Sequence, residues 1–465
     1  MLRPVSRPAV SLFALIALVA ACGARSALDD RDLRDGGLPI DAPIDAPVDA
    51  PVDAPVDAPV DVPVDAPDAP QCVPTAERCN GRDDDCDGLV DEGLVYQPIA
   101  PAYVLRTTEG DTGAGTPCSS CRWVWDPSLV PTSTGWVVPF RLGIYGGREQ
   151  PSLFLRATDA DGRGLGTVGT AGTAVPLRLR RMDMPGPDGA TWLDATLRVG
   201  TSDLPGWVIV DAAGQTRVLV QNDAITRSPS ITLGPSVLVA TAAGINLRVD
   251  QHLVRGTEVR TTSRRVLIPD IAQGGLTSLG LAVSPGGDGA VLFVARFVSS
   301  PRSFRMWTQR LGPSGEPVGA AALLLDAEAP LTFFAVTTDG GYLLFEPGNG
   351  SPATARFVDA ALTRPGDPIV LDPGTRGSGL TFDHLRMPDG GWLVHTANVL
   401  VRLDPRGRPL ARWTGALTPS GQDSSVVSPD LNHRGGRTFI TWHDVTASST
   451  PNTLWIRELG CLPEP

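Results

Sequence analysis

The amino-acid sequence predicts an all-β protein whose main part, residues 95–465, is a β-propeller. Glycine and proline are abundant, at 51 and 44 of 465 residues, whereas only 19% of residues are charged, which is typical of turn-rich, strand-rich chains. Short apolar or alternating segments recur along this region without the periodicity of amphipathic helices. The clearest of these segments begin at Gly135, Thr191, Val291, Tyr342, Trp392 and Thr438.

The number of blades follows from paired turn glycines. One glycine heads an apolar strand in each of seven units, at intervals of 45 to 55 residues: Gly135, Gly189, Gly234, Gly289, Gly341, Gly391 and Gly436. A second turn glycine follows inside each unit: Gly162, Gly214, Gly256, Gly315, Gly366, Gly407 and Gly460. Two hairpins per unit make four strands, and a repeat of roughly 40 to 50 residues with four strands is what a propeller blade requires. We therefore predict seven four-stranded blades; six or eight blades, or an irregular array of β-sandwiches, are the alternatives.

A propeller must close, and the sequence predicts where. The last predicted strand, Thr453–Leu459, leads directly into Cys461, while Cys118 and Cys121 lie just before the first predicted blade. We expect the two ends of the propeller region to meet in one closed ring, held by a disulfide from Cys461 to the N-terminal region. In the chain-entropy model, closing such a long loop stabilises the fold by more than about 4 kcal/mol.

The first residues predict export. Arg3 and Arg7 precede the uncharged apolar run 9–21, which ends in small residues, as in an export signal spanning residues 1–21. This run is shorter than the roughly 20 residues that a membrane-spanning helix needs. Val19-Ala-Ala-Cys22 resembles the lipobox of bacterial lipoproteins, which implies that Cys22 is lipidated and anchors the protein outside the cytoplasm, at the outer membrane or cell surface. An ordinary signal peptide is the alternative.

Residues 22–71 are predicted to form a disordered stalk. From Asp41 to Pro70 the sequence reads DAPIDAPVDAPVDAPVDAPVDVPVDAPDAP, with aspartate at every fourth position through Asp65. Proline at this density blocks helix and sheet, and the repelling aspartates stiffen an extended, polyproline-like chain. At about 3.1 Å per residue such a stalk reaches on the order of 150 Å, well clear of a lipid surface.

Residues 72–94 form a cysteine-rich acidic segment with the register of a calcium loop. Aspartates occupy the first, third and fifth loop positions, and Gly88 occupies the sixth, where a sharp turn is required. The twelfth position holds Leu94 in place of the usual bidentate glutamate, and Asp91 or Glu92 is expected to substitute for it. The predicted calcium ligands are Asp83, Asp85, Asp87, the carbonyl oxygen of Leu89, Asp91 and Glu92.

The same segment is similar to the metal-binding motif of MopE-type bacterial surface proteins. The match, Cys-Asn-Gly-x-Asp-x-Asp-Cys-Asp-Gly-x-Val-Asp-Glu, lies between Cys72 and Gly93. That family is associated with copper, but an all-oxygen site without histidine or methionine suits calcium, because copper prefers imidazole or sulfur ligands. Copper binding, and a disulfide-pinned acidic segment that holds no metal, remain the alternatives.

Composition excludes several functions. All 39 basic residues are arginine, so Schiff-base chemistry, pyridoxal phosphate linkage and a phosphate-loop lysine are excluded. The net charge is −12, and because this acidic excess lies before residue 94, the propeller region is formally neutral, which argues against nucleic-acid binding. Six cysteines accompany Cys22, an even number that predicts three disulfides in an exported chain.

No catalytic motif is visible in the propeller region. The sequence has neither a His-Glu-x-x-His zinc motif nor a Gly-x-Ser-x-Gly elbow. The stretch 164–169 matches a dinucleotide fingerprint by letter, but no helical pattern follows it and a loop is expected. The adjacent pairs Asp383-His384 and His443-Asp444 are expected to make surface or strand-end hydrogen bonds. Four tryptophans near strand starts are expected to pack between blades: Trp136, Trp192, Trp392 and Trp442.

These features predict a non-catalytic surface protein that presents a binding face to an extracytoplasmic protein or glycan. The alternative is an exported propeller enzyme, a polysaccharide hydrolase or lyase with carboxylates at the channel. The fold class alone does not separate the two.

Overall fold

The computed structural model divides the 465-residue chain into two units, Met1–Ala69 and Pro70–Pro465, and every residue that it describes belongs to the second. The described residues are 73–78, 83–87, 93–107, 123–143, 152–170, 175–181, 190–199, 202–220, 229–243, 246–255, 258–268, 275–299, 302–328, 331–347, 351–371, 373, 382–396, 399–415, 417, 426–444 and 453–463. The predicted export signal, Cys22 and the predicted stalk lie outside these residues. Among the described segments, no helix has the length and apolar character needed to cross a membrane.

All regular structure in the described part of the chain is β-strand. In chain order the strands are β1 (Leu94–Pro98), β2 (Tyr103–Thr107), β3 (Trp123–Trp125), β4 (Val130–Pro131), β5 (Trp136–Gly143), β6 (Ser152–Thr158), β7 (Gly164–Thr170), β8 (Val175–Arg181), β9 (Thr191–Val199), β10 (Ser202–Val210), β11 (Thr216–Val220), β12 (Ser230–Leu233), β13 (Ser236–Ala243), β14 (Asn246–Arg255), β15 (Glu258–Val266), β16 (Leu276–Val283), β17 (Ala290–Ser299), β18 (Arg302–Leu311), β19 (Pro317–Ala327), β20 (Phe334–Thr338), β21 (Gly341–Glu346), β22 (Thr354–Asp359), β23 (Ile369–Val370), β24 (Phe382–Arg386), β25 (Trp392–Thr396), β26 (Val399–Leu403), β27 (Pro409–Trp413), β28 (Val426–Arg434), β29 (Arg437–Asp444) and β30 (Thr453–Pro463).

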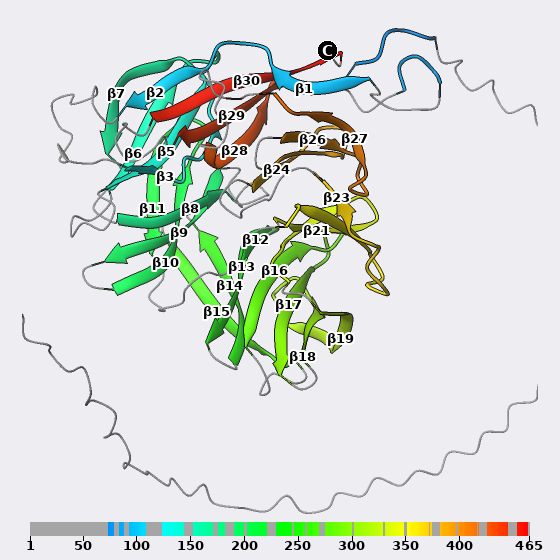
Figure 1. Cartoon of the computed structure of the whole chain (residues 1–465). Helices are drawn as coiled ribbons and strands as arrows, with labels where there is room; N and C mark the ends of the chain where they lie inside the picture. Colours follow the sequence, from blue (N-terminus) through cyan, green and yellow to red (C-terminus); the bar gives the residue numbers. More distant parts are fainter. Residues whose placement is uncertain are drawn as a thin grey trace, which may run out of the picture. The chain divides into compact units, whose positions relative to one another are not determined.

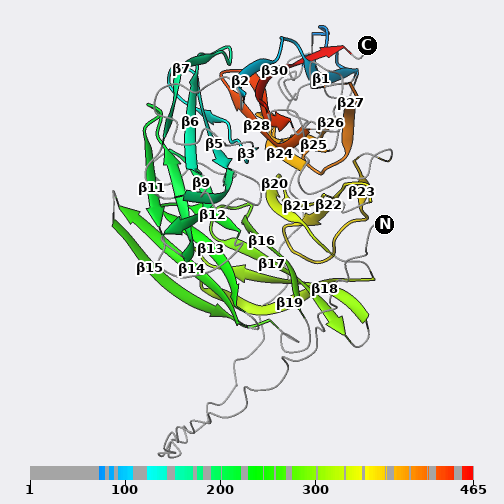
Figure 2. The same ribbon diagram turned by 60° about the vertical axis from the view of Figure 1, so that its left-hand side comes forward.

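The strands form seven sheets that follow one another as blades around a ring, which confirms the predicted propeller (Figures 1 and 2). Six blades use consecutive strands: β3–β7, β8–β11, β12–β15, β16–β19, β20–β23 and β24–β27. In the first blade the short strands β3 and β4 both pair with β5 and together stand in for one inner strand. The seventh blade joins β28, β29 and β30 from the end of the chain to β1 and β2.

The hydrophobic core is divided among the seven interfaces between neighbouring blades. One buried cluster lies at each interface, for example Trp192 and Trp207 of the second blade against Val237 and Val239 of the third. The cluster between the seventh and first blades closes the ring, and in it Trp136 contacts Phe439 with ring centroids 5.0 Å apart. Burying a large apolar side chain contributes roughly 1.5–3 kcal/mol, so each interface is a substantial source of stability. The four tryptophans predicted to pack between blades are all buried: Trp136, Trp192, Trp392 and Trp442.

Close approach of two strands explains most of the strand-heading glycines. Each of those described precedes or begins the second strand of a blade. A Cβ atom at Gly135, Gly289, Gly341 or Gly391 would lie 2.0–2.5 Å from a carbonyl oxygen at the end of the third strand, so only glycine fits. Gly189 lies outside the described residues. Gly234 and Gly436 have open space around them and positive φ angles of 54° and 80°, so they serve tight turns.

The prediction of a second turn glycine in each blade is confirmed in four of the described blades and wrong in two. Gly162, Gly214, Gly315 and Gly407 lie in the hairpin between the third and fourth strands, with φ between 78° and 85°. In the fifth blade Leu362 takes this turn position at φ 62°, and Gly366 follows it. Gly460 lies inside β30, because the seventh blade takes its outer strand from the N-terminal side and has no such hairpin. Gly256 lies outside the described residues.

Two further expectations need correction. Residues 164–169, expected to be a loop, lie in β7, the outer strand of the first blade, which pairs with β6. The segment from Trp392 that was predicted as one strand is two, β25 and β26, which pair as a hairpin. In both cases the backbone conformation is determined by pairing with a neighbouring strand, which outweighs a weak local sequence pattern.

Candidate functional site

The acidic segment gathers three carboxylates. Oxygen atoms of Glu77, Asp83 and Asp85 lie within 4.8 Å of one another. Calcium takes oxygen ligands at about 2.3–2.6 Å, so ligands on opposite sides of one ion are roughly 5 Å apart. The three carboxylates are therefore close enough to share a single hard cation, and they include two of the residues that the sequence predicts as ligands.

Backbone hydrogen bonds hold the segment in this shape. The amides of Asp84 and Asp85 donate to Glu77 Oε1 at 2.7 and 2.9 Å, and the amide of Thr75 donates to the carbonyl oxygen of Asp84 at 2.7 Å. The amide of Asp87 donates to both Asp83 Oδ1 and Asp85 Oδ1 at 3.1 Å. These hydrogen bonds fix the carboxylates of Glu77, Asp83 and Asp85 relative to the backbone of the segment.

The structure adds Glu77 to the predicted ligands and leaves others untested. Glu77 precedes Asp83, the first position of the calcium-loop pattern. A prediction based on the positions of that pattern therefore does not include it. Asp87 contributes its amide to the turn. Leu89, Asp91 and Glu92 lie outside the described residues, and their role as ligands stays a prediction.

The ring closes where the sequence predicts. β30 pairs along its length with two N-terminal strands: β1 against Leu459–Pro463, and β2 against residues 453–456. Figure 1 shows these blue strands alongside the red β30. Tyr96 lies opposite Cys461 in this register. Cys86 and Cys461 each take part in a disulfide bond, but the partner of neither is described; the other five cysteines lie outside the described residues, so the predicted pairing of Cys461 stays a prediction.

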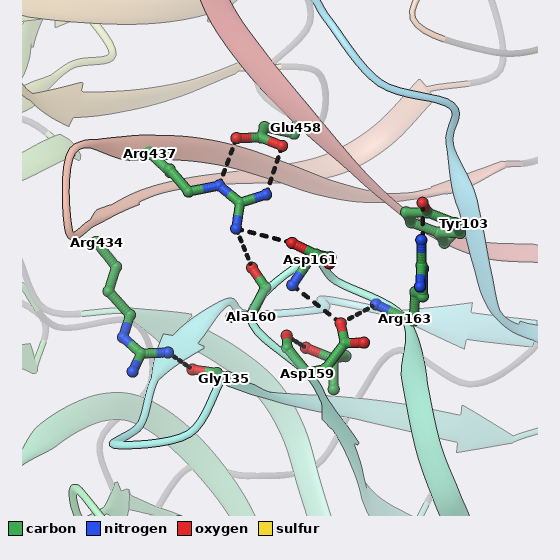
Figure 3. Close-up of polar contacts among 10 residues, drawn as sticks. Tyr103, Gly135, Asp159, Ala160, Asp161, Arg163, Arg434, Arg437 and Glu458 are labelled. Carbon is green, nitrogen blue, oxygen red and sulfur yellow. Dashed lines mark hydrogen bonds and ion pairs between the residues drawn. The ribbon is translucent and has the colours of Figure 1, made fainter.

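An arginine on β29 joins the seventh blade to the first (Figure 3). Arg437 donates from Nε and Nη2 to the two carboxylate oxygens of Glu458, each at 2.6 Å. Its Nη1 donates across the interface to the carbonyl oxygen of Ala160 at 2.9 Å and to Asp161 Oδ1 at 3.0 Å. The hydrogen bond to Glu458 raises the pKa of Arg437 further above its ordinary range. Nearby, Arg434 Nη1 donates to the carbonyl oxygen of Gly135 at 2.5 Å. We call Arg437, Glu458 and Asp161 the seam latch.

The two histidines expected at surface or strand-end hydrogen bonds are instead buried. His384 lies among aromatic rings of the fifth and sixth blades, with Phe345 5.2 Å and Trp392 5.8 Å away between ring centroids. His443 is 1% exposed, and burial, together with Arg141, lowers its pKa to about 3. The expectation was wrong because strand positions next to a blade interface are enclosed by the neighbouring blade. Asp383 does make the expected kind of contact: its Oδ2 accepts the amide of Leu431, at 2.6 Å.

No protein-family model matches the chain, and no curated protein matches it in sequence. Solved structures similar to it include the Dos1 propeller, at 10% identity and TM-score 0.37, covering 75% of this chain and 96% of that one. The AfRom2 CNH domain is similar at 11% identity and TM-score 0.40, covering 77% and 98%. The Trypanosoma rangeli sialidase in complex with the inhibitor DANA is similar at 9% identity and TM-score 0.39, covering 63% of this chain and 56% of that one.

At such identities these similarities say nothing of activity, and the propeller assignment rests on the strand pairing. The described geometry offers one set of hard oxygen ligands and one charged latch across the closing interface. The first suits a divalent cation, and the second suits a structural role.

Proposed function

We propose that this protein is an exported lipoprotein, anchored through Cys22, whose propeller presents a binding surface to a protein or glycan outside the cytoplasm. The observation that carries this proposal is the order of parts along the chain. An apolar run ending at Cys22 is followed by the Asp/Pro stalk, the acidic segment and a closed ring. A rigid ring on a long stalk suits recognition at a distance from the membrane. Dual or triple acylation of one cysteine anchors a protein stably, since each buried methylene contributes about 0.8 kcal/mol.

We further propose that the acidic segment binds calcium at the base of the ring. The close approach of Glu77, Asp83 and Asp85 supports this, because a cation between three carboxylates within 4.8 Å of one another would relieve their mutual repulsion. The donor set is all oxygen in the described part of the segment, which suits calcium over copper. Seven residues after Asp87 the chain enters β1, so cation binding would order the connection between stalk and ring.

The anchor is tested by replacing Cys22 with serine in full-length protein expressed in a bacterial host. The variant should move from the membrane fraction to the soluble exported fraction, because serine cannot carry the thioether-linked lipid. Membrane association that is unchanged in Cys22→Ser contradicts the anchor.

Calcium binding is tested by titration calorimetry on the full chain, with Glu77→Gln and Asp83→Asn as variants. Both should weaken calcium binding, because each removes one charged oxygen ligand. Asp211→Asn is the matched control: Asp211 accepts two amides in the turn between β10 and β11 but has no part in the acidic segment. Copper binding without any calcium response would contradict the proposal.

A further inference from the structure

The inner strands of the first and seventh blades are both interrupted where they meet. In the first blade the chain is irregular between β3 and β4, and in the seventh the register of β28 with β29 shifts between Val427 and Asp430. Each interruption contains a residue with positive φ that is followed by proline: Asp126 at 45° and Ser428 at 48°. The two residues touch, since Ser428 Oγ donates to Asp126 Oδ1 at 3.4 Å.

Both backbone conformations are strained. Residues other than glycine rarely adopt positive φ, and a following proline restricts the backbone further. Neighbouring groups hold the segments in place: the amide of Leu129 donates to Asp430 Oδ2 at 2.5 Å, and Asn432 Nδ2 donates to the carbonyl oxygen of Leu129 at 2.6 Å. Strained residues that the surrounding structure fixes in this way are concentrated at ligand and active sites.

The side chains around this point form a compact polar group. Arg141 Nη2 donates to Asp126 Oδ2 at 2.6 Å, and the two side chains are 12% and 21% exposed, so they reach solvent only in part. His443 belongs to the strand paired with β28, and its register partner Val427 is the residue next to Ser428. Within the described residues the buried Nδ1 of His443 has no hydrogen-bond partner, and the low pKa of this imidazole keeps it neutral.

This group lies at the opposite end of the seventh blade from the seam latch. Ser428 is near the beginning of β28, whereas the latch residue Arg437 follows the turn at its other end. The β6–β7 hairpin of the first blade lies on the latch side, because Arg437 donates to Asp161 in its turn (Figure 3). The strained group therefore belongs to the other face of the ring, beside the inner strands that line its centre.

We propose that Asp126, Ser428 and Arg141 form a subsite for a neutral polyhydroxyl ligand, one sugar residue of a glycan. A carboxylate beside a hydroxyl and a guanidinium offers acceptors and donors side by side, which matches the adjacent hydroxyls of a sugar. Asp126 and Arg141 cancel in charge and His443 is neutral, while the carboxylate of Asp430 is buried and accepts the amide of Leu129, so an anionic ligand gains no net attraction. This inference deepens the proposed binding function and names the ligand class for one face of the ring.

The same geometry favours binding over catalysis. A general base works best when its pKa lies near the working pH, and the pKa of His443, at about 3, is far below neutrality. Within the described part of the chain the hydroxyl of Ser428 donates to a carboxylate, so the arrangement differs from a serine nucleophile that donates to its histidine base.

The test is titration calorimetry of the full chain against neutral hexose and N-acetylhexosamine oligosaccharides. Uronic acid oligomers and deacetylated amino sugar oligomers serve as charged counterparts. We expect binding of a neutral oligosaccharide, weakened at least tenfold in both Ser428→Ala and Asp126→Asn. Two variants are used because either alone could disturb the interface, and thermal unfolding of each checks that it is folded.

A third variant separates function from strain. Ser428→Gly relieves the positive φ and should raise the melting temperature while it weakens oligosaccharide binding. Leu362→Gly is the matched control, because it relieves a φ of 62° in the fifth blade and should leave binding unchanged. Absence of binding to every neutral oligosaccharide, binding to charged ones alone, or full binding by the variants overturns the inference. None of these variants touches Cys22 or the acidic segment, so membrane fractionation and calcium titration report separately on the proposed function.

Discussion

Gly407 offers a test of how tightly the blades pack against one another. It lies at φ 82° in the turn between β26 and β27, and a Cβ atom there would meet Leu343 Cδ2 at 2.7 Å and Ala355 Cβ at 3.5 Å. Both neighbours belong to the fifth blade, and both are fully buried. Gly407→Ala therefore imposes two costs, an unfavourable backbone angle and an overpacked blade interface.

Gly340 provides the matched control. Its φ is 78°, nearly that of Gly407, but a Cβ atom there would meet nothing within 4 Å. Gly340→Ala should cost about 1–2 kcal/mol of unfolding free energy for the backbone, less about 0.4–1 kcal/mol because alanine restricts the unfolded chain. Gly407→Ala should cost about 1–3 kcal/mol more, which is typical of overpacking a core.

The two variants are compared by urea denaturation followed through tryptophan fluorescence. The comparison is valid if both transitions keep the same dependence on urea, since the slope reports the surface exposed on unfolding. A Gly407→Ala variant no less stable than Gly340→Ala would refute the argument, because Leu343 would then have room to move and the interface would be loosely packed.

Three further predictions concern the closing interface. Arg437→Gln should lower the free energy of unfolding by about 1–3 kcal/mol in urea denaturation, because Glu458, which is 13% exposed, loses a bidentate partner. The control is the exposed pair of Arg386 and Asp339, in which Arg386→Gln should cost at most about 1 kcal/mol. Burial lowers the pKa of His443 to about 3, from about 6.5 in the unfolded chain, so the unfolded state binds the extra proton and stability falls as pH drops from about 6.5 toward 3. In His443→Gln this fall should be shallower, and equal slopes for variant and parent would show that other groups cause it. Cys461→Ser should speed hydrogen exchange first in β1, β2 and β30, and exchange that rises evenly around the ring would contradict a disulfide clamp at the seam.

The blade repeat was predictable because its cause is local. Gly135 and Gly391 recur at the head of a second strand since a Cβ atom would strike the neighbouring strand of the same blade. The constraint leaves a glycine at this place in four of the described blades, and turn glycines mark two others. The number of blades was predicted from this repeat, and the meeting of the chain ends from the need to close a ring.

The errors arise where distant segments decide the structure. Gly460 looked like one more turn glycine, but its strand pairs with β1, where Gln97 and Pro463 are 366 residues apart. His443 and His384 were expected at surface or strand-end positions, because the sequence around them does not show which residues of the neighbouring blade cover them. Asp126 and Ser428 each precede proline and read locally as turn residues. Their strain and their contact exist only because the first and last blades meet.

The acidic segment shows a third situation, in which the sequence indicates two of the carboxylates that lie close together but not the third. Asp83 and Asp85 could be identified from their spacing, because the ligands of a calcium loop occupy alternate positions in a fixed register. Glu77 reaches the same place from outside that register, by capping the amides of Asp84 and Asp85. A carboxylate that joins the group by accepting backbone amides follows no sequence spacing that could be recognised in advance.

The pairing of β1 and β2 with β30 also bears on how the protein is made. Among the described strands the ribosome synthesises β1 first and its partner β30 last, so the seam can form only after the strands of the other blades have been made. Bringing together residues this far apart costs about 5 kcal/mol of loop entropy, which the local hairpins of the other blades avoid. A product that stops before Thr453 would expose the edges of β1, β2 and β29 together, and unpaired edges of this kind promote aggregation and attract proteases. Ring closure thus distinguishes complete chains from truncated ones, because only a chain synthesised through β30 can join β29 to β1 and β2.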